Sequence, residues 1–234
     1  MNLSRICLGA IIFIAVSTFA TGQKPPKAVL VDELGSADCS DLRARVDDFL
    51  RGVVERPAEI GFVITRGPSS KKVTLVHREE LVRAQIESRK FEPSRIKFIR
   101  ATDENELKIE FWRLPSSAGD FDLIHRDSDY SLPAVVRPFL LLQDDEYNES
   151  ECYDLDESRI ASLFLKDNQG SRLNIVFYAQ SEKAANSKKR RILNSFVRIH
   201  KIGRGRIRTF FKISPLDPEN PKPTEYWYLP PKKK

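Results

Sequence analysis

The chain is poor in the residues from which metal sites and many active sites are built. Among its 234 residues there are three cysteines, three histidines and two tryptophans. No histidine lies in a His-x-x-x-His or Cys-x-x-Cys spacing that would present two ligands to one metal ion. The spacing of His77, His125 and His200 therefore predicts solvated or capping histidines and no metal site.

Sequence motifs of acyl, nucleotide and zinc-hydrolase chemistry are missing as well. The chain contains no Gly-x-Ser-x-Gly elbow, no glycine-rich phosphate loop and no His-Glu-x-x-His. Its one basic glycine turn, Gly203-Arg-Gly205, is not preceded by the strand that a nucleotide loop requires. We therefore expect no catalytic residue and no cofactor, and a protein that is not an enzyme.

Long apolar runs are absent except at the start of the chain. After Arg5, residues 6–19 are apolar with small residues mixed in, and small residues follow at 20–22. The run is shorter than the ~20 residues that a membrane-spanning helix needs, and the whole pattern is typical of a secretory signal. We predict a signal peptide at residues 1–22, with an uncleaved anchor as the alternative, and a periplasmic or secreted mature protein.

What the sequence does contain is an internal duplication. The hexapeptide EFWRLP at 110–115 returns as EYWYLP at 225–230, and further stretches match in the same order. At a separation of 111 positions, Leu81 matches Ile192, Val82 matches Leu193, and Arg95-Ile96-Lys97 matches Arg206-Ile207-Arg208. Nearer the start, Leu30 matches Leu142, and Cys39-Ser40-Asp41-Leu42 matches Cys152-Tyr153-Asp154-Leu155. Two copies indicate a tandem duplication rather than a solenoid.

Each copy has the same predicted order of elements, strand-helix-strand-helix-strand-strand. Apolar side chains recur at helical spacing from Leu42 to Val54, and Leu107, Ile109 and Phe111 alternate with charged residues, as in a strand with one buried face. The fold class is therefore α+β, with two tandem β-α-β-α-β-β units, each a mixed sheet with two helices. The predicted parts are a signal peptide at 1–22, a first unit at 23–116, a linker at 117–138, and a second unit with a basic C-terminal tail at 139–234.

The repeated hexapeptide is predicted to close the last strand of each unit, because proline cannot donate to the strand ladder. Trp112 and Trp227 are then expected to be apolar anchors that pack against a helix or against the sister unit. The second helix of each unit is predicted at His77–Lys90 and at Ser187–Lys201.

Two cysteines remain once the signal peptide removes Cys7. Cys39 and Cys152 occupy matched places in the two units, and an oxidising compartment allows them to pair. Pairing requires their Cα atoms to lie within about 7 Å of each other. If the units pack about an axis close to both loops, the cysteines form a disulfide. If the units pack elsewhere, both stay free thiols.

Charge is distributed unevenly along the chain, although the net charge of +6 is modest. Residues 183–212 contain eleven Lys or Arg and no acid, whereas residues 144–157 contain eight acids and no base. One interpretation is two solvated faces that partly neutralise each other. The other is a basic face on unit two that binds an anionic partner through salt-screened attraction. Its candidate residues are Lys188, Lys189, Arg190, Arg191, Arg204, Arg206 and Arg208.

Phrases such as Arg45-Val-Asp-Asp-Phe49 and Pro93-Ser-Arg-Ile96 look like those of exported bacterial proteins with no assigned activity. The order of elements in each unit resembles the periplasmic C-terminal domain of the outer-membrane protein A family. Members of that family hold the diaminopimelate group of peptidoglycan between an Asp after the second strand and an Arg that opens the second helix. In copy one, Arg66 stands near the aspartate position and Arg78 near the arginine position, and both are candidate ligand-binding residues. In copy two the strand runs into Tyr178-Ala-Gln180 and the helix position is Lys189, so neither copy keeps the Asp–Arg pair.

Together these patterns predict an exported, non-catalytic binding module of the cell envelope. The expected partner is an anionic envelope polymer or another envelope protein, and not a nucleic acid. One alternative is a peptidoglycan-binding protein of the outer-membrane protein A type. Another is an enzyme whose site lies between the two units and uses acids of residues 144–157 with a histidine, since clefts between domains often hold sites.

Overall fold

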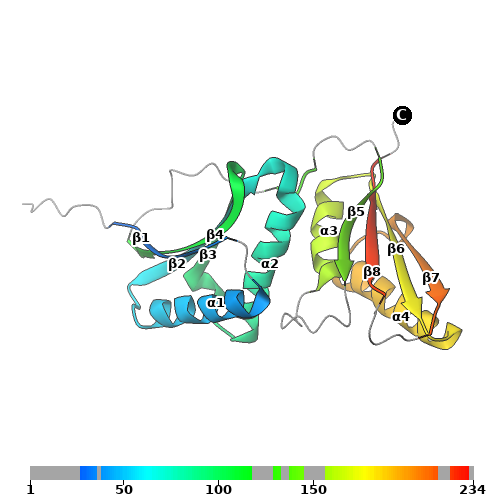
Figure 1. Cartoon of the computed structure of the whole chain (residues 1–234), viewed down its shortest axis with the longest axis horizontal. Helices are drawn as coiled ribbons and strands as arrows, with labels where there is room; N and C mark the ends of the chain where they lie inside the picture. Colours follow the sequence, from blue (N-terminus) through cyan, green and yellow to red (C-terminus); the bar gives the residue numbers. More distant parts are fainter. Residues whose placement is uncertain are drawn as a thin grey trace, which may run out of the picture.

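Two α+β units lie side by side along the long axis of the molecule (Figure 1). The computed structural model describes residues 27–35, 38–117, 129–132, 137–144, 156–215 and 222–231. Each unit has a four-stranded mixed sheet and two α-helices, which confirms the predicted fold class. The predicted signal peptide lies outside the described residues. Within the described ranges, no helix is both long enough and apolar enough to span a membrane.

The two units have the same topology. Unit one contains β1 (Val29–Leu34), α1 (Cys39–Val54), β2 (Glu59–Pro68), α2 (Lys72–Ser88), β3 (Ile96–Ala101) and β4 (Asp103–Pro115). Unit two contains β5 (Phe139–Asp144), α3 (Glu157–Asp167), β6 (Arg172–Ala179), α4 (Glu182–Asn194), β7 (Ile207–Ile213) and β8 (Thr224–Leu229). The strand orders are β1-β4-β2-β3 and β5-β8-β6-β7. In each sheet the two strands that flank the second helix are parallel and the other pairs are antiparallel.

The second helix of each unit begins five residues earlier than the sequence pattern predicts. In unit one, a 3-10 turn at Ser69–Lys71 leads directly into α2. In unit two, the Ser181 hydroxyl accepts a hydrogen bond from the backbone N–H of Ala184 at the start of α4. The first N–H groups of a helix have no partner within it, so a turn or a cap that serves them lets the helix extend toward the preceding strand.

The repeated Glu-x-Trp sequence occupies the same place in both sheets. Trp112 lies opposite Leu30 of β1, and Trp227 lies opposite Leu140 of β5. Each indole Nε1 donates a hydrogen bond to the glutamate two residues earlier, over 2.9 Å in unit one and 2.7 Å in unit two. The hexapeptide therefore recurs because the same strand position closes the same ladder.

Both tryptophans point away from the helices, which corrects the expectation that they pack against one. Successive side chains of a strand alternate between the two faces, and in each unit the preceding aromatic ring, Phe111 or Tyr226, enters the helix-side core. Trp112 packs on the opposite sheet face against residues of its own unit. These residues are Phe62, Ile64, Ile99 and Leu114.

Two sequence alignments are displaced in the structure. Pairing with the tryptophans makes Leu30 equivalent to Leu140 rather than to Leu142, and a β-bulge follows at the same point of both strands. A π-helical turn after α4, Ser195–Ile199, inserts one residue into the second helix. The residues that α2 buries in its core, Leu75, Val82 and Ile86, therefore correspond to Ala185, Ile192 and Phe196.

A repeated arginine ties the first helix of each unit to the turn before the third strand. Arg95 donates to three carbonyl oxygens at the end of α1 and just after it, and Arg206 does the same for α3, at N···O distances of 2.6–3.2 Å. Their acceptors are Val53, Arg56 and Glu59, and Leu165, Asn168 and Ser171, respectively. The last carbonyl groups of a helix lack internal partners and favour a cation. The structure thus directs Arg206 into its unit.

Residues 129–132 of the predicted linker bind both units. Lys72 of α2 donates to Asp129 over 2.8 Å, and this contact, together with hydrogen bonds from Ser131, lowers the pKa of Asp129 to about 2. On the other side, the backbone N–H of Tyr130 donates to Asp167 at the end of α3. Val76 of α2 is fully buried in the hydrophobic core of unit two. The units are therefore joined by a shared core and by hydrogen bonds, rather than by a tether alone.

Replacing the repeated arginine should destabilise the fold. We expect Arg206→Ala to lower the free energy of unfolding by about 2 kcal/mol, because several buried carbonyl groups lose a charged donor. Arg206→Lys should recover less than half of this loss, since one ammonium group does not reproduce the planar fork. Arg204→Ala, two residues earlier and exposed, is the matched control and should change stability by less than about 0.5 kcal/mol. Urea unfolding measures all three, and equal effects of the two alanine variants would contradict the assignment.

Candidate functional site

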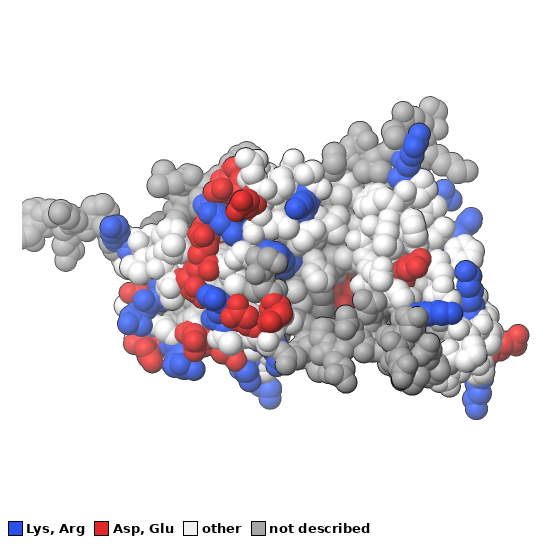
Figure 2. All heavy atoms as spheres, viewed as in Figure 1, with Lys and Arg blue, Asp and Glu red and all other residues white. Residues whose placement is uncertain are grey.

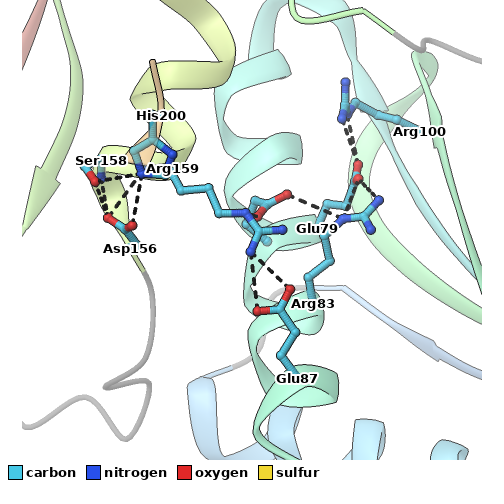
Figure 3. Close-up of polar contacts among 9 residues, drawn as sticks. Glu79, Arg83, Glu87, Arg100, Asp156, Ser158, Arg159 and His200 are labelled. Carbon is cyan, nitrogen blue, oxygen red and sulfur yellow. Dashed lines mark hydrogen bonds and ion pairs between the residues drawn. The ribbon is translucent and has the colours of Figure 1, made fainter. Parts of the chain in front are cut away.

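The α2–α3 contact holds most of the buried charge in the described part of the chain. Five charged residues are buried among the described residues. Four of them lie at or beside this contact, namely Lys72, Glu79, Glu80 and Arg100, and the fifth is Glu110. Figure 3 shows Arg159 extending from α3 toward α2, where it lies between two acids. Its Nε is 2.8 Å from Glu80 Oε2, and its Nη1 is 3.1 Å from Glu87 Oε1. This ion-pair network joins the two units.

Glu80 depends on its arginine partners to remain ionised. Its side chain is 4% exposed, and burial raises its pKa above the ordinary value, while Arg159 and Arg83 lower it. The neighbouring Glu79 binds Arg83 at 2.7 Å and Arg100 at 2.9 Å. The acids of α2 therefore pair with arginines of the same chain. Arg159 was not predicted from the sequence, because its one signal there is that it is the first cation after the acidic stretch.

A serine, a histidine and an aspartate meet at the first turn of α3 (Figure 3). Asp156 caps the helix by accepting hydrogen bonds from the backbone N–H groups of Ser158 and Arg159. The Ser158 hydroxyl also contacts Asp156, and it lies 2.5 Å from Ser195 Oγ and 3.2 Å from His200 Nε2. His200 Nε2 is in turn 3.2 Å from Asp156 Oδ2. An acid of residues 144–157 therefore does lie beside a histidine, next to the contact between the units.

The geometry of this cluster fits a helix cap better than a catalytic relay. In a Ser-His-Asp array the serine and the carboxylate bind different ring nitrogens, so that the carboxylate can stabilise the imidazolium that forms. Here Ser158 and Asp156 share the Nε2 atom of His200. A proton taken from the serine would go to the same nitrogen that faces the carboxylate. The arrangement satisfies the polar groups at the start of α3 without preparing a nucleophile.

Of the other two histidines, His77 is the one that lies in the described ranges. His77 lies within α2, and burial lowers its pKa. His125 lies outside the described residues. Within the described ranges, no group of three His, Cys, Asp or Glu side chains is placed to hold a metal ion.

α4 presents a basic surface, defined by Lys183, Lys189, Arg190, Arg191 and Arg198 on this helix and its π turn. Lys189, Arg190 and Arg198 form no ion pair with any described residue. The excess of bases lies in one part of the second unit: residues 156–215 contain 14 Lys or Arg and four Asp or Glu, whereas residues 139–234 contain 18 and 13, and residues 27–117 contain 17 and 16. Figure 2 shows red and blue groups intermingled over unit one, whereas the blue groups at the outer edge of unit two have few red neighbours.

The α4 basic surface is the counterpart of the α2 face that holds the two units together. In the core-based alignment, Lys189 and Arg190 replace Glu79 and Glu80. Lys183 and Asn186 likewise replace Val73 and Val76, which pack against the core of unit two. This face of the second helix thus carries apolar and acidic residues in α2, where unit two covers it. It carries basic and polar residues in α4, where no described residue covers it in the same way.

The other basic candidates of unit two lie apart from one another in the structure. Lys188 is half-buried, with its ammonium group 5.7 Å from the centre of the Phe177 ring. Arg204 is exposed in the turn before β7, and Arg208 is exposed on β7. Since Ile207 enters the helix-side core, Arg208 points to the opposite sheet face. The predicted basic face is therefore centred on α4, with Arg208 on the other side of the sheet.

The two candidates of unit one are bound within that unit. Arg66 lies 2.7 Å from Asp103 and 3.0 Å from Glu110, with its side chain 13% exposed. Arg78 donates to the carbonyl oxygen of Gly35 over 2.9 Å. Arg66 and the Nη1 group of Arg78 are thus engaged within unit one, and neither arginine offers an acceptor to the amine of a ligand.

Cys39, at the first turn of α1, is disulfide-bonded. Cys152, whose matched position makes it one possible partner, lies outside the described residues, so a Cys39–Cys152 disulfide stays a prediction. The chain matches no protein-family model and no curated protein.

Removing Arg159 should destabilise the chain in a pH-dependent way. We expect Arg159→Met to lower the free energy of unfolding by about 2 kcal/mol near pH 7, because Glu80 then stays buried with only the more distant Arg83, at 3.4 Å, to compensate its charge. The pKa of Glu80 is already raised by burial, so the penalty applies where the group is ionised and disappears as the pH falls below its unfolded value of about 4.5. Urea unfolding near pH 7 and below about pH 4.5 measures how the loss of unfolding free energy changes with pH.

The matched control is the double variant Glu80→Gln, Arg159→Met, which removes the buried charge together with its partner. It should recover most of the loss at neutral pH. A loss from Arg159→Met that is equally large in acid would show that Arg159 acts through packing and not through the ion pair.

Ser158 should not behave as an activated nucleophile. Because the serine and the aspartate share one imidazole nitrogen, we expect no labelling of the folded chain by a fluorophosphonate probe. Intact-mass measurement checks this directly. A fluorophosphonate adduct on Ser158 that His200→Ala abolishes would contradict the assignment of the cluster to helix capping.

Proposed function

We propose that this chain is an exported, non-catalytic binding module of the cell envelope, and that the α4 basic surface recognises its partner. The partner is an anionic polymer or the acidic surface of another envelope protein. Lys189, Arg190 and Arg198 of this surface have no acidic partner among the described residues, and such cations attract polyanions through a sequence-independent, salt-screened field. The neighbouring cations repel one another within the unit unless an external anion compensates their charge.

The observation that carries the proposal is the replacement of acids by bases on equivalent helices. Glu79 and Glu80 of α2 bind arginines within the chain, whereas Lys189 and Arg190 of α4 bind no described acid. A surface that only needed to be soluble would carry mixed charges, as unit one does. The excess of one sign on one helix supports an anionic partner.

The capping geometry of the Asp156–Ser158–His200 cluster supports a binding role rather than an enzymatic one. The engagement of Arg66 and Arg78 within unit one supports a site on unit two rather than a peptidoglycan site of the outer-membrane protein A type. The partner's identity is therefore best approached with polymers that differ in charge and in backbone.

Charge reversal on α4 tests the proposal. We expect Lys189→Glu, Arg190→Glu to weaken binding of fluorescent heparin, used as a model polyanion, by at least about tenfold in anisotropy titrations at low salt. The slope of log K against log salt should become shallower by about two, one for each lost contact. Isolated cell wall and an acidic polypeptide, tested in parallel, distinguish polymer from protein partners.

The matched control is Arg51→Glu, Lys71→Glu, which makes the same change in net charge at exposed sites of unit one. It should change heparin affinity less than about threefold. Equal losses from both pairs would mean that net charge alone attracts the polymer, and no retention of the unaltered chain on any of the three probes would remove the proposal.

A further inference from the structure

The exposed apolar side chains of the chain are concentrated on two strands. Six of the nine large apolar residues that are exposed in the described part lie on β1 or β7. They are Val29, Leu30 and Val31 on β1, and Phe210, Phe211 and Ile213 on β7. Both strands lie at a sheet edge, so among the described residues each pairs on one side only. Such an edge offers unpaired backbone N–H and C=O groups to another strand.

The other two edge strands are less open. β3 is the unit-one counterpart of β7, but Ile99, Arg100 and Ala101 on it are buried, and Arg100 donates to the backbone carbonyl of Asp129. β5, the counterpart of β1, has Leu140 as its one large exposed apolar residue among its described side chains. The duplication therefore leaves one open edge on each unit.

The two open edges carry opposite charge. β1 contains the acid Glu33, next to Asp32, which Arg45 of α1 binds over 2.8 Å, and β7 contains Arg208 and Lys212. Pairing β1 with β1 or β7 with β7 would place like charges across the ladder, which is destabilising. Pairing β1 with β7 places opposite charges there instead.

The side chains that would meet also share a face. Leu30 and Glu33 lie opposite Trp112 and Glu110 of β4, on the sheet face away from the helices. Phe210 lies on the corresponding face of the second sheet, as do the two cations beside it, because Ile207 points into the helix-side core. In a continued sheet Leu30 can pack against Phe210 while Glu33 faces Arg208 in an antiparallel register or Lys212 in a parallel one.

From this geometry we infer that copies of the chain associate head to tail, with β1 of one copy adding to β7 of the next. Figure 1 shows β1 and β7 near opposite ends of the long axis, so each added copy leaves one open edge at either end. A contact of this kind is heterologous and builds an open chain of molecules rather than a closed dimer. The inference does not involve the α4 basic surface and stands apart from the proposed function.

Sedimentation velocity of the purified chain tests association. The weight-average sedimentation coefficient should rise with protein concentration at low ionic strength and fall toward the monomer value at high ionic strength, where the charge pairs are screened. Leu30→Lys and Phe210→Lys each block one edge, and each variant alone should sediment as a monomer. Val54→Lys, at an exposed apolar residue of α1, is the matched control and should associate like the unaltered chain.

Mixing the two blocked variants gives the decisive result. Leu30→Lys keeps an intact β7 and Phe210→Lys keeps an intact β1, so an equimolar mixture should form a species of about twice the monomer mass and nothing larger. A mixture that stays monomeric, a blocked variant that still associates alone, or an unaltered chain that is monomeric at every concentration would each overturn the inference.

Charge exchange gives a second, independent test that leaves the apolar residues in place. Glu33→Lys should weaken association. Restoration by Arg208→Glu in the same chain identifies an antiparallel pairing, and restoration by Lys212→Glu identifies a parallel one. Restoration by neither change counts against the β1–β7 contact.

Discussion

The packing of α2 against α3 is the contact on which the rest of the molecule depends. It brings Val76 into the core of unit two and buries Glu80 against Arg159. The apolar part supplies most of the favourable free energy, because burial of a side chain of this size contributes about 1.5–3 kcal/mol. The ionic part contributes less net energy, since desolvation offsets much of the attraction. It makes the contact selective, because an unpaired carboxylate in this position is costly.

This contact also decides which surfaces stay open. A repeat that packs second helix against first helix can in principle continue indefinitely. The next second helix, α4, has Lys183 and Asn186 where α2 has its valines, so it does not offer the same apolar face to a further helix. At the other end, the outer side of α1 carries Asp48, whose side chain is 71% exposed. Polar terminal faces are what a short repeat array needs to remain soluble.

The two units have kept one backbone and diverged in the use of charge. Unit one pairs its acids and bases internally, as Arg66 illustrates with Asp103 and Glu110, and its helix acids hold unit two. Unit two keeps an excess of bases on α4 and on β7. We attribute the first surface to an anionic partner and the second to a neighbouring copy of the chain. Both assignments follow from the same fact, which is that a face covered in one unit is uncovered in the other.

The repeat, the order of elements and the α+β class could be determined from the sequence, because they depend on local periodicity and on a duplicated hexapeptide. The strand register and the one-residue π insertion after α4 could not be read in this way, since they depend on which residues pair across the sheet and which enter the core. For the basic candidates of unit two, the sequence predicted that the region is basic, but not which of its residues reach the surface. Arg206 and Arg208 are two positions apart and equally basic, yet Arg206 binds helix carbonyls and Arg208 faces solvent.

The sequence by itself therefore determined what each element is and how many units there are. Only the tertiary structure decided how the units meet, and with it the roles of Glu80, Arg159 and the α4 cations. The physical reason is that periodicity reports which side of an element is apolar, but not which partner covers it. The sequence shows that a residue is charged, but not whether that charge pairs with a neighbouring helix or remains accessible to a ligand.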